Sequence, residues 1–535
     1  MTNASVTSRT ATMKRRMFLR FAASGSLAAP AIGRAQARTI LKFVPQADLT
    51  VLDPVFAPAV VTRNHAYMVF DQLFALDDSY RAQPQMLEGH VVENDGLTWK
   101  LTLREGLRFH DDTPVLARDA AASIERWAPR DSFGQTLRAA TEEVSAPSDR
   151  VVQIRLKKPF PMLPFALARG ALVMPERLAR TPGTVQVTEM TGSGPFRFLA
   201  AERVSGARVA YERWPGYVPR SGGTASFAAG PKIAYVDRVE WHTIPDGATA
   251  AAALQAGEVD WLNEPAADLL SMLGRHRDIT VEVKDKGGIV GMIRFNHLNP
   301  PFDNPAIRQA LLGGIVQSDF MIAAIGDDRT LWRDQCGFLP PNSPFASDTG
   351  MEAITVKPDL GRVKAALAAA GYRGARVVLL APTDIPALRA MGEVAADMFR
   401  RVGLEVEYPA LDWGTVLQRI ANREAVEKGG WNACALTVPG QLAANPATHS
   451  YMRGLGKAGP AFGWPESRAY EELFSRFMDT PDEAGQQTIA RQMQAEAFRN
   501  VPYLPTGLWF QPYAFRRNIT GILNGFPLFH NVKKG

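Results

Sequence analysis

Alternation of apolar and polar residues marks the clearest predicted strands. Residues 97–104, with the sequence LTWKLTLR, place apolar side chains at every second position, and residues 151–156 follow the same rule. A period of two residues is typical of a strand that buries one face. Residues 39–45 add a run of β-branched and aromatic side chains, which favours a strand close to the start of the folded region.

A second pattern, with a period near 3.6 residues, predicts helices. In residues 113–127 the apolar side chains of Ala120, Ile124 and Trp127 share one face. Residues 304–312 begin with Asn304 and Pro305, a favoured pair at a helix start. Further helices are predicted over residues 63–73, 248–256, 359–370 and 385–402, and the last three of these end at glycines.

The order of elements in the second half of the chain indicates the fold class. Residues 375–380 and 404–408 are predicted strands, and the helix 385–402 lies between them. Strand, helix and strand in this order favour a partly parallel sheet. We therefore predict an α/β protein with mixed sheets, and its length allows two or three cores.

The positive charge of the chain is concentrated at the N-terminus. The 535 residues include 60 lysines and arginines and 54 acidic residues, which gives a formal charge of +6. Six of those 60 basic residues, and no acidic ones, lie in residues 1–37, so the other 54 match the 54 acids. A remainder without net charge gives no support to nucleic acid as a partner.

The N-terminal segment resembles an export signal. Arg15 and Arg16, followed by Phe18 and Leu19, precede an apolar run over residues 21–32 and a small-x-small site at residues 35–37. This layout is typical of a signal peptide, and the arginine pair resembles that of the twin-arginine route. We expect residues 1–37 to be removed and the mature protein to act in the periplasm. The alternative is a basic segment that stays attached in the cytoplasm.

The residues that usually carry catalysis or bind metals are sparse. The eight histidines form no His-x-His or His-Glu-x-x-His pair, and no Gly-x-Ser-x-Gly elbow or phosphate-binding loop occurs in the predicted mature chain. We predict no enzyme activity, no cofactor and no metal site. Cys336 and Cys434 are either joined by one long-range disulfide or are two separate buried thiols.

Five blocks, in order along the chain, resemble the bacterial extracellular solute-binding proteins of the oligopeptide, dipeptide and nickel class (family 5). The most specific block is residues 97–111, continuing to Arg126. The others are residues 192–196, 254–260, 295–310 and 501–505. The resemblance implies the two-lobed periplasmic binding protein fold with an extra subdomain in lobe I and a hinge of two segments.

The resemblance also implies where the lobes begin and end. Lobe I is expected over residues 38–289, with a subsidiary layer at about 87–190, and is completed by residues 505–535. Lobe II is expected over residues 290–504, so the chain crosses the hinge twice. Closure of the lobes over a ligand would be the mechanism.

The resemblance places a set of residues at the ligand cleft. In relatives, a Trp is followed by an Asp that pairs with the amino terminus of the peptide, and Cys434 stands where that Asp is expected. Asp412 is a candidate substitute. The expected ligand-binding residues are Val61, Thr62, Trp413, Trp431, Asn432, Cys434 and Thr437.

The function implied is capture of a peptide or peptide-like ligand for an ABC importer. Its expected partners are the ligand and the permease subunits, and the protein is expected to be a monomer. Cys434 in the Asp position leaves a non-peptide ligand, such as an oligosaccharide, an opine or a chelated metal, as the alternative. A periplasmic hydrolase is the remaining hypothesis, although no catalytic constellation supports it.

Overall fold

The computed structural model describes residues 38–57 and 59–535. The predicted signal peptide, residues 1–37, therefore lies outside the described residues. Thr39–Gly535 forms one compact unit. None of the helices in the described ranges is both long enough and apolar enough to cross a membrane.

A seven-stranded sheet, here called the N-terminal sheet, holds the first strand of the chain. Its order is β10-β11-β12-β1-β13-β22-β14, and β1 runs parallel to both of its neighbours. Phe43 of β1 packs edge-on against Trp261 and Phe529, so aromatic side chains fill the core beside this sheet. The strands are β1 (Ile40–Val44), β10 (Phe196–Phe198), β11 (Arg208–Arg213), β12 (Arg238–His242), β13 (Trp261–Leu262), β14 (Ile279–Glu282) and β22 (Tyr513–Arg516).

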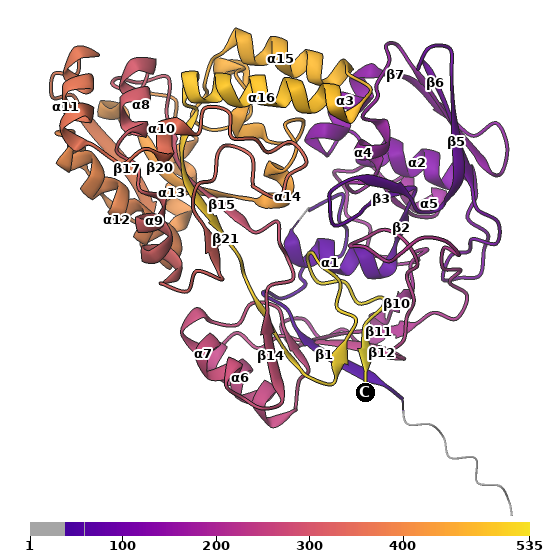
Figure 1. Cartoon of the computed structure of the whole chain (residues 1–535). Coiled ribbons are helices and arrows are strands. Elements are labelled where there is room, and N and C mark those ends of the chain that lie inside the picture. The colour runs from indigo at the N-terminus through magenta and orange to yellow at the C-terminus, as the bar shows by residue number, and fades with distance from the viewer. Residues whose placement is uncertain (1–37, 58) are drawn as a thin grey trace, which may run out of the picture. The chain divides into compact units, whose positions relative to one another are not determined.

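A separate antiparallel sheet, in the order β5-β6-β8-β7, falls within the region where we expected a subsidiary layer. The alternation predicted for residues 97–104 appears in β6, which buries Trp99, Leu101 and Leu103. Helices α2 and α3 pack beside it (Figure 1). These elements are β5 (Leu87–Glu93), β6 (Thr98–Leu103), β7 (Thr141–Ser145), β8 (Val151–Leu156), α2 (Ala117–Trp127) and α3 (Ser132–Ala140).

A second seven-stranded sheet, here called the C-terminal sheet, has the order β16-β21-β15-β20-β17-β18, with β19 paired to β17. β17 is parallel to β18 and β20, whereas β15 is antiparallel to both of its neighbours. The sheet is therefore mixed, as predicted. Its strands are β15 (Ile289–Phe295), β16 (Trp332–Arg333), β17 (Arg376–Pro382), β18 (Glu405–Glu407), β19 (Ala410–Leu411), β20 (Ala433–Pro439) and β21 (Tyr503–Trp509).

Helices cover the C-terminal sheet and follow the predicted periodicity. α12 packs on β17 and β20, and α9 packs on β21. Asn304 caps α8 by accepting a hydrogen bond from the amide of Ala306. The helices are α8 (Pro305–Leu312), α9 (Gln317–Ile325), α11 (Leu360–Ala369), α12 (Pro386–Arg401), α15 (Arg468–Asp479) and α16 (Glu483–Asn500).

The chain passes between the two large sheets twice. β14 belongs to the N-terminal sheet and β15 to the C-terminal sheet, so residues 283–288 connect them. The return runs from β21 to β22 through residues 510–512, and Figure 1 shows these two passages side by side. Two adjacent connections of a few residues are the geometry that a hinge requires.

Two predicted helices have different boundaries. The helix expected over residues 63–73 is α1, Val60–Val69. Phe70 is extended and Asp71 begins a short strand, so the helix ends four residues earlier than predicted. The helix expected from residue 113 begins at Ala117, because the Asp119 carboxylate accepts from the amide of Leu116 and fixes the helix start there.

The two cysteines do not form a disulfide. Cys336 and Cys434 are both buried and free. Of the two alternatives left open by the sequence, the structure therefore has the separate thiols. Burial raises the pKa of the Cys336 thiol to about 12, so this thiol stays protonated at neutral pH.

Candidate functional site

A recess lies where the crossover 283–288 meets segments from both large sheets. We call it the crossover recess, and its cavity measures about 30 Å³. A cavity of this size holds a water molecule or one small polar group. Its lining residues are Asp78, Tyr80, Phe227, Asp285, Lys286, Gly287, Gln441, Asn524, Gly525 and Phe526.

Other hollows are larger but are lined by a single part of the molecule. One of about 550 Å³ lies between α2 and residues 179–184, all on the N-terminal side of the crossover. Ligand sites occur preferentially between the moving parts of a protein. The crossover recess fits this rule, because its lining comes from residues on both sides of the crossover. We therefore take it as the candidate ligand site.

Glycines allow the crossover to approach its neighbours closely. A β-carbon on Gly287 would overlap the hydroxyl of Tyr80, and one on Gly440 would overlap the carbonyl of Gly287. The amide of Gly440 donates to the carbonyl of Gly288 over 2.8 Å. Gly440 opens α14 (Gly440–Ala443), which follows β20, so the C-terminal sheet contacts the crossover directly.

Asp285 presents a carboxylate to the recess from the crossover itself. One of its oxygens accepts from the amide of Gly287 over 2.9 Å. Within residues 38–57 and 59–535, no Lys, Arg or His nitrogen lies within 4.0 Å of it. Burial raises the pKa of Asp285 above its usual value, and the nearby charge of Arg63 offsets this only in part.

Arg63, in the first turn of α1, carries the complementary charge. Among the described residues, the only hydrogen-bond acceptor of its guanidinium is the side-chain oxygen of Asn64, at 3.1 and 3.3 Å. It also stacks on the Phe526 ring, 3.8 Å from the centroid. Burial lowers the pKa of Arg63, and the charge of Asp285 partly opposes that shift.

The C-terminal segment holds Phe526 in place. The Phe526 ring packs edge-on against Tyr67 at 5.0 Å and Phe227 at 4.8 Å between centroids. Gly525 donates its amide to the carbonyl of Lys284 and accepts from the hydroxyl of Tyr513, over 2.9 and 2.8 Å. The loop is therefore tied to the crossover on one side and to β22 on the other.

Two of the predicted site residues lie in the first turn of α1, next to Arg63. Val61 and Thr62 are both buried. The Thr62 hydroxyl donates to the carbonyl of Val51 over 2.8 Å, so this side chain braces the segment before the helix. Ala59, at the N-cap, offers no side-chain cap to the helix.

Three other predicted residues lie in the core of the C-terminal sheet. Trp431 is fully buried and its indole donates to the carbonyl of Ile420 over 3.1 Å. The Asn432 amide accepts from Val378 and donates to the carbonyl of Pro300. Cys434 is buried within β20. None of these three side chains lines the crossover recess.

Thr437 and Trp413 are less buried than Trp431, Asn432 and Cys434. Thr437 lies near the end of β20 and is half-buried. Trp413 begins α13 (Trp413–Ile420) and is also half-buried. Asp412, the candidate substitute acid, is exposed and caps α13 by accepting from the amide and hydroxyl of Thr415. These residues do not line the recess either.

Sequence reasoning selected neither the lining residues Asp285, Gln441 and Phe526 nor Arg63, which stacks on Phe526. Of these four residues, only Arg63 is next in the sequence to a predicted ligand-binding residue, Thr62. The pair Gly287-Gly288 is a sequence feature that would have pointed to a close backbone approach at the crossover, but it was not used in the prediction. No spacing rule connects Phe526 with Arg63. In the described part of the chain, no three His, Cys, Asp or Glu side chains gather where they could hold a metal ion.

Comparison with known families assigns the class of the protein. Residues 81–460 match the model of the bacterial extracellular solute-binding proteins, family 5. The chain belongs to this family. The solved structures that it resembles show that it has the two-lobed periplasmic binding protein fold.

Individual relatives match over nearly the whole chain. A probable peptide ABC transporter periplasmic-binding protein of Sinorhizobium fredii is 34% identical over 531 residues, covering 96% of this chain and 97% of the relative. The ABC transporter substrate-binding protein CtaP of Listeria monocytogenes superposes with a TM-score of 0.78 at 17% identity. The match covers 92% of this chain and 99% of CtaP. The binding protein AgaA of Agrobacterium tumefaciens, in complex with agropinic acid, superposes with a TM-score of 0.71 at 20% identity. The match covers 93% of this chain and 99% of AgaA.

Proposed function

We propose that this chain is the periplasmic binding component of an ABC importer and that it captures a peptide or peptide-like ligand at the crossover recess. The observation that carries the proposal is the recess itself, which residues from both sides of the crossover line. Support for the ligand class comes from the relative named as a peptide-transport binding protein, which the chain matches over 96% of its length.

Capture depends on movement of two lobes about the crossovers. We take lobe I as residues 38–289 with 505–535, and lobe II as residues 290–504. The cavity of about 30 Å³ holds only one small group, so the recess is wider in the form that holds a peptide, and movement of the lobes provides that space. A ligand drives closure to the extent that it binds the closed arrangement better than the open one.

The proposed role involves no bond making. The protein binds the ligand, closes, and presents the closed form as a monomer to the permease subunits. Residues 1–37 direct export, with Arg15 and Arg16 selecting the twin-arginine route. Substituting both arginines with lysine is expected to keep the protein in the cytoplasm, and fractionation of the producing cells measures this.

A ligand screen tests the proposed function. Pools of peptides with two to five residues, sugars and metal chelates are added to the mature protein, and the melting temperature is recorded. We expect a peptide pool to raise the melting temperature in proportion to the logarithm of its concentration, with no product formed. Stabilisation by sugars or chelates alone would replace the ligand class, and turnover of any pool would contradict the binding role.

A further inference from the structure

A second contact between the proposed lobes lies outside the crossover recess. It brings the start of α16 next to the segment before α4 (Leu163–Leu167), and Figure 1 shows α16 beside α3 and α4. Arg81 pairs with Glu483 over 2.7 Å, and Lys158 lies 3.7 Å from Asp479. We call this region the α16 contact, and it consists of Arg81, Lys158 and Met162 from lobe I and Asp479, Glu483 and Gln486 from lobe II.

The buried part of the α16 contact is a hydrogen bond to sulfur. The side-chain amide of Gln486 donates to the thioether of Met162 over 3.2 Å. The same nitrogen donates to the carbonyl of Thr480 over 2.9 Å, so lobe II itself holds Gln486 in place. Met162 and Gln486 are both buried, whereas the side chains of the four charged residues are exposed. The sulfur is therefore enclosed in part by the other lobe.

Met162 lies where apolar residues of both proposed lobes meet. Its neighbours Phe160 and Leu163 are buried. These three residues belong to a continuous apolar cluster that also includes Phe345 and Phe477 of lobe II. When the lobes part, the sulfur loses its hydrogen-bond donor and the cover that lobe II provides. Met162 is thus a thioether whose access to solvent depends on the position of the lobes.

A thioether that reaches solvent reacts with two-electron oxidants such as hydrogen peroxide. A lone pair of sulfur attacks one peroxide oxygen, so that an S–O bond forms and the O–O bond breaks. The departing hydroxide takes the proton of the transferred oxygen and leaves as water. Sulfur is oxidised by two electrons and the peroxide is reduced. The product is a sulfoxide, which is polar and one oxygen larger than the thioether.

The sulfoxide does not fit the closed form. Met162 is only 6% exposed there, and the Gln486 amide already lies 3.2 Å from the sulfur. The added oxygen has to displace this amide or be buried against apolar side chains, and burying a further polar group is costly. Overpacking of a filled site adds to that cost. Oxidation therefore favours the open arrangement.

We propose that Met162 is an oxidation site that the closed lobes protect, and that its sulfoxide opposes closure. The inference rests on the proposed function, because it requires lobes that part and close. A ligand then protects Met162, and oxidation of Met162 weakens ligand binding, since both act on the same equilibrium between open and closed forms. The oxidant is of the peroxide class, and the proposed periplasmic location lies outside the reducing environment of the cytoplasm.

The first test measures the oxidation rate at individual methionines. The mature protein is treated with hydrogen peroxide, with and without a saturating pool of peptides of two to five residues that contain no methionine, cysteine or tryptophan. Mass spectrometry of proteolytic fragments gives the rates. The controls are Met272, which is exposed, and Met292, which is fully buried in β15. We expect the pool to slow oxidation of Met162 about tenfold or more, while Met272 reacts equally in both samples and Met292 stays unreacted.

Matched variants measure the effect of oxidation on closure. Met162→Leu keeps a similar volume without a sulfur atom, and Met272→Leu is its control. After peroxide treatment, the wild type and M272L should bind the pool about tenfold more weakly in calorimetry, and M162L should bind it as before. Gln486→Ala should speed oxidation of Met162 in the absence of peptide. Melting curves recorded before and after treatment establish that each protein is still folded.

The outcomes separate the inference from the proposed function. If the pool binds but Met162 is oxidised at the same rate with and without it, or if oxidation leaves the affinity unchanged, the inference fails while peptide capture stands. If no peptide pool binds, capture of peptides fails, and X-ray scattering of the unliganded protein decides the inference. A radius of gyration that increases on oxidation in the wild type and not in M162L supports it, and an unchanged radius in both overturns it.

Discussion

The guanidinium of Arg63 lies 3.8 Å from the centroid of the Phe526 ring, although 463 positions separate the two residues. Phe526 is buried, and its ring also packs against Tyr67 and Phe227. The last segment of the chain therefore sets the position of a charge in the first helix.

Phe526→Leu tests this relationship. The substitution is expected to destabilise the protein by about 1–2 kcal/mol and to weaken ligand binding, because Arg63 loses the ring that holds it. Denaturant unfolding and calorimetry measure the two effects. Phe477→Leu, at a fully buried position of α15, is the control and should lower stability similarly without changing affinity. Equal affinities for both variants would contradict the role of the stack.

Gly287→Ala tests whether the close approach at the crossover belongs to the closed form. The new β-carbon would overlap the hydroxyl of Tyr80, so closure and affinity are expected to fall. Adding Tyr80→Phe should restore part of the affinity, because it removes the overlapping oxygen. Gly89→Ala is the control, since a β-carbon there meets nothing within 4 Å. Unchanged affinity in Gly287→Ala would show that the ligand does not need this approach.

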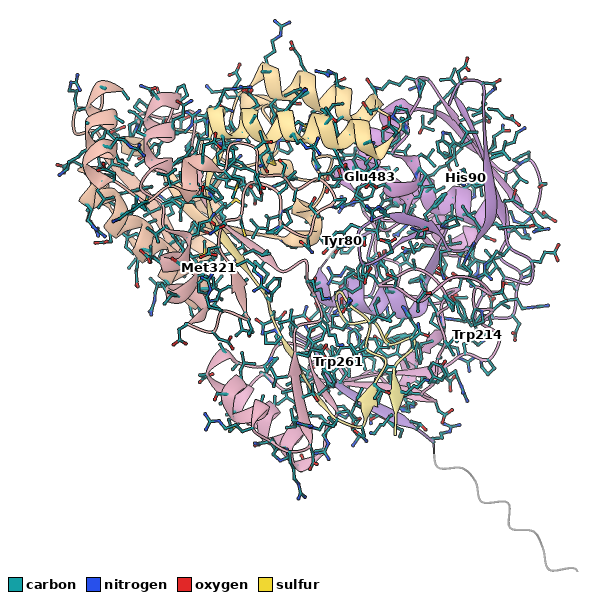
Figure 2. All side chains as sticks on the ribbon, in the orientation of Figure 1. Tyr80, His90, Trp214, Trp261, Met321 and Glu483 are labelled. Carbon is teal, nitrogen blue, oxygen red and sulfur yellow. The ribbon has the colours of Figure 1, made fainter. Side chains whose placement is uncertain are left out.

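Arg81 and Glu483 form a contact between the two proposed lobes, away from the crossover. The guanidinium donates to both carboxylate oxygens, over 2.8 and 2.7 Å, and Glu483 begins α16 (Figure 2). Both side chains are partly exposed, so the pair is worth at most about 1 kcal/mol. Arg81→Glu should reduce ligand affinity two- to fivefold, and the swap Arg81→Glu with Glu483→Arg should recover it. The effect should shrink at high salt, and equal affinity in all three proteins would contradict it.

The pair Asp53–Arg126 is expected to be a main determinant of stability at low pH. Burial alone would raise the pKa of Asp53, but hydrogen bonds from Arg126 and the amide of Val187 leave it below its usual value. A carboxyl whose folded pKa is depressed contributes stability above the unfolded pKa, near 4, and this stability is lost as pH falls through the folded value. Stability measured by denaturant between pH 7 and pH 3 should therefore fall.

Asp53→Asn isolates that contribution. It leaves the Arg126 guanidinium buried without its counter-ion, so the free energy of unfolding at pH 7 should decrease by about 3–5 kcal/mol. The double variant Asp53→Asn with Arg126→Met should recover much of the loss, because it also removes the unpaired charge. A decrease below about 1 kcal/mol in the single variant would show that the pair is not important for folding.

Local sequence rules accounted for much of the fold. Asn304 caps α8 as predicted, and Gly257 ends α6 (Gly247–Ala256) in a left-handed conformation. The predicted strand, helix and strand of residues 375–408 are β17, α12 and β18, with the strands parallel. These features depend on neighbours within a few residues, where the pattern of side chains is informative. The end of α1 was missed because Phe70 and Leu73 continue the apolar spacing of the helix, whereas Asp71 and Gln72 between them form a short buried strand that pairs with β9 (Leu172–Val173).

The candidate site was far less predictable. Trp431, Asn432 and Cys434 are buried beside the C-terminal sheet and do not line the crossover recess, and their role in ligand binding stays a prediction. The positions of these side chains depend on which face of β20 packs inward. The apolar run in this segment does not reveal that face. Asp285, Gln441 and Phe526 meet only because the two crossovers bring distant segments together. No local pattern in the sequence encodes that meeting.

A measurement of the distance between the proposed lobes tests capture by closure. Val204→Cys and Val356→Cys, both on exposed positions of opposite lobes, allow two dyes to be attached, since Cys336 and Cys434 are buried. Val185→Cys with Val204→Cys, both in lobe I, is the control pair. We expect a saturating peptide pool to shift single molecules from low to high energy transfer in the inter-lobe pair and to leave the control unchanged. An identical distribution with and without a ligand that raises the melting temperature would contradict capture by closure.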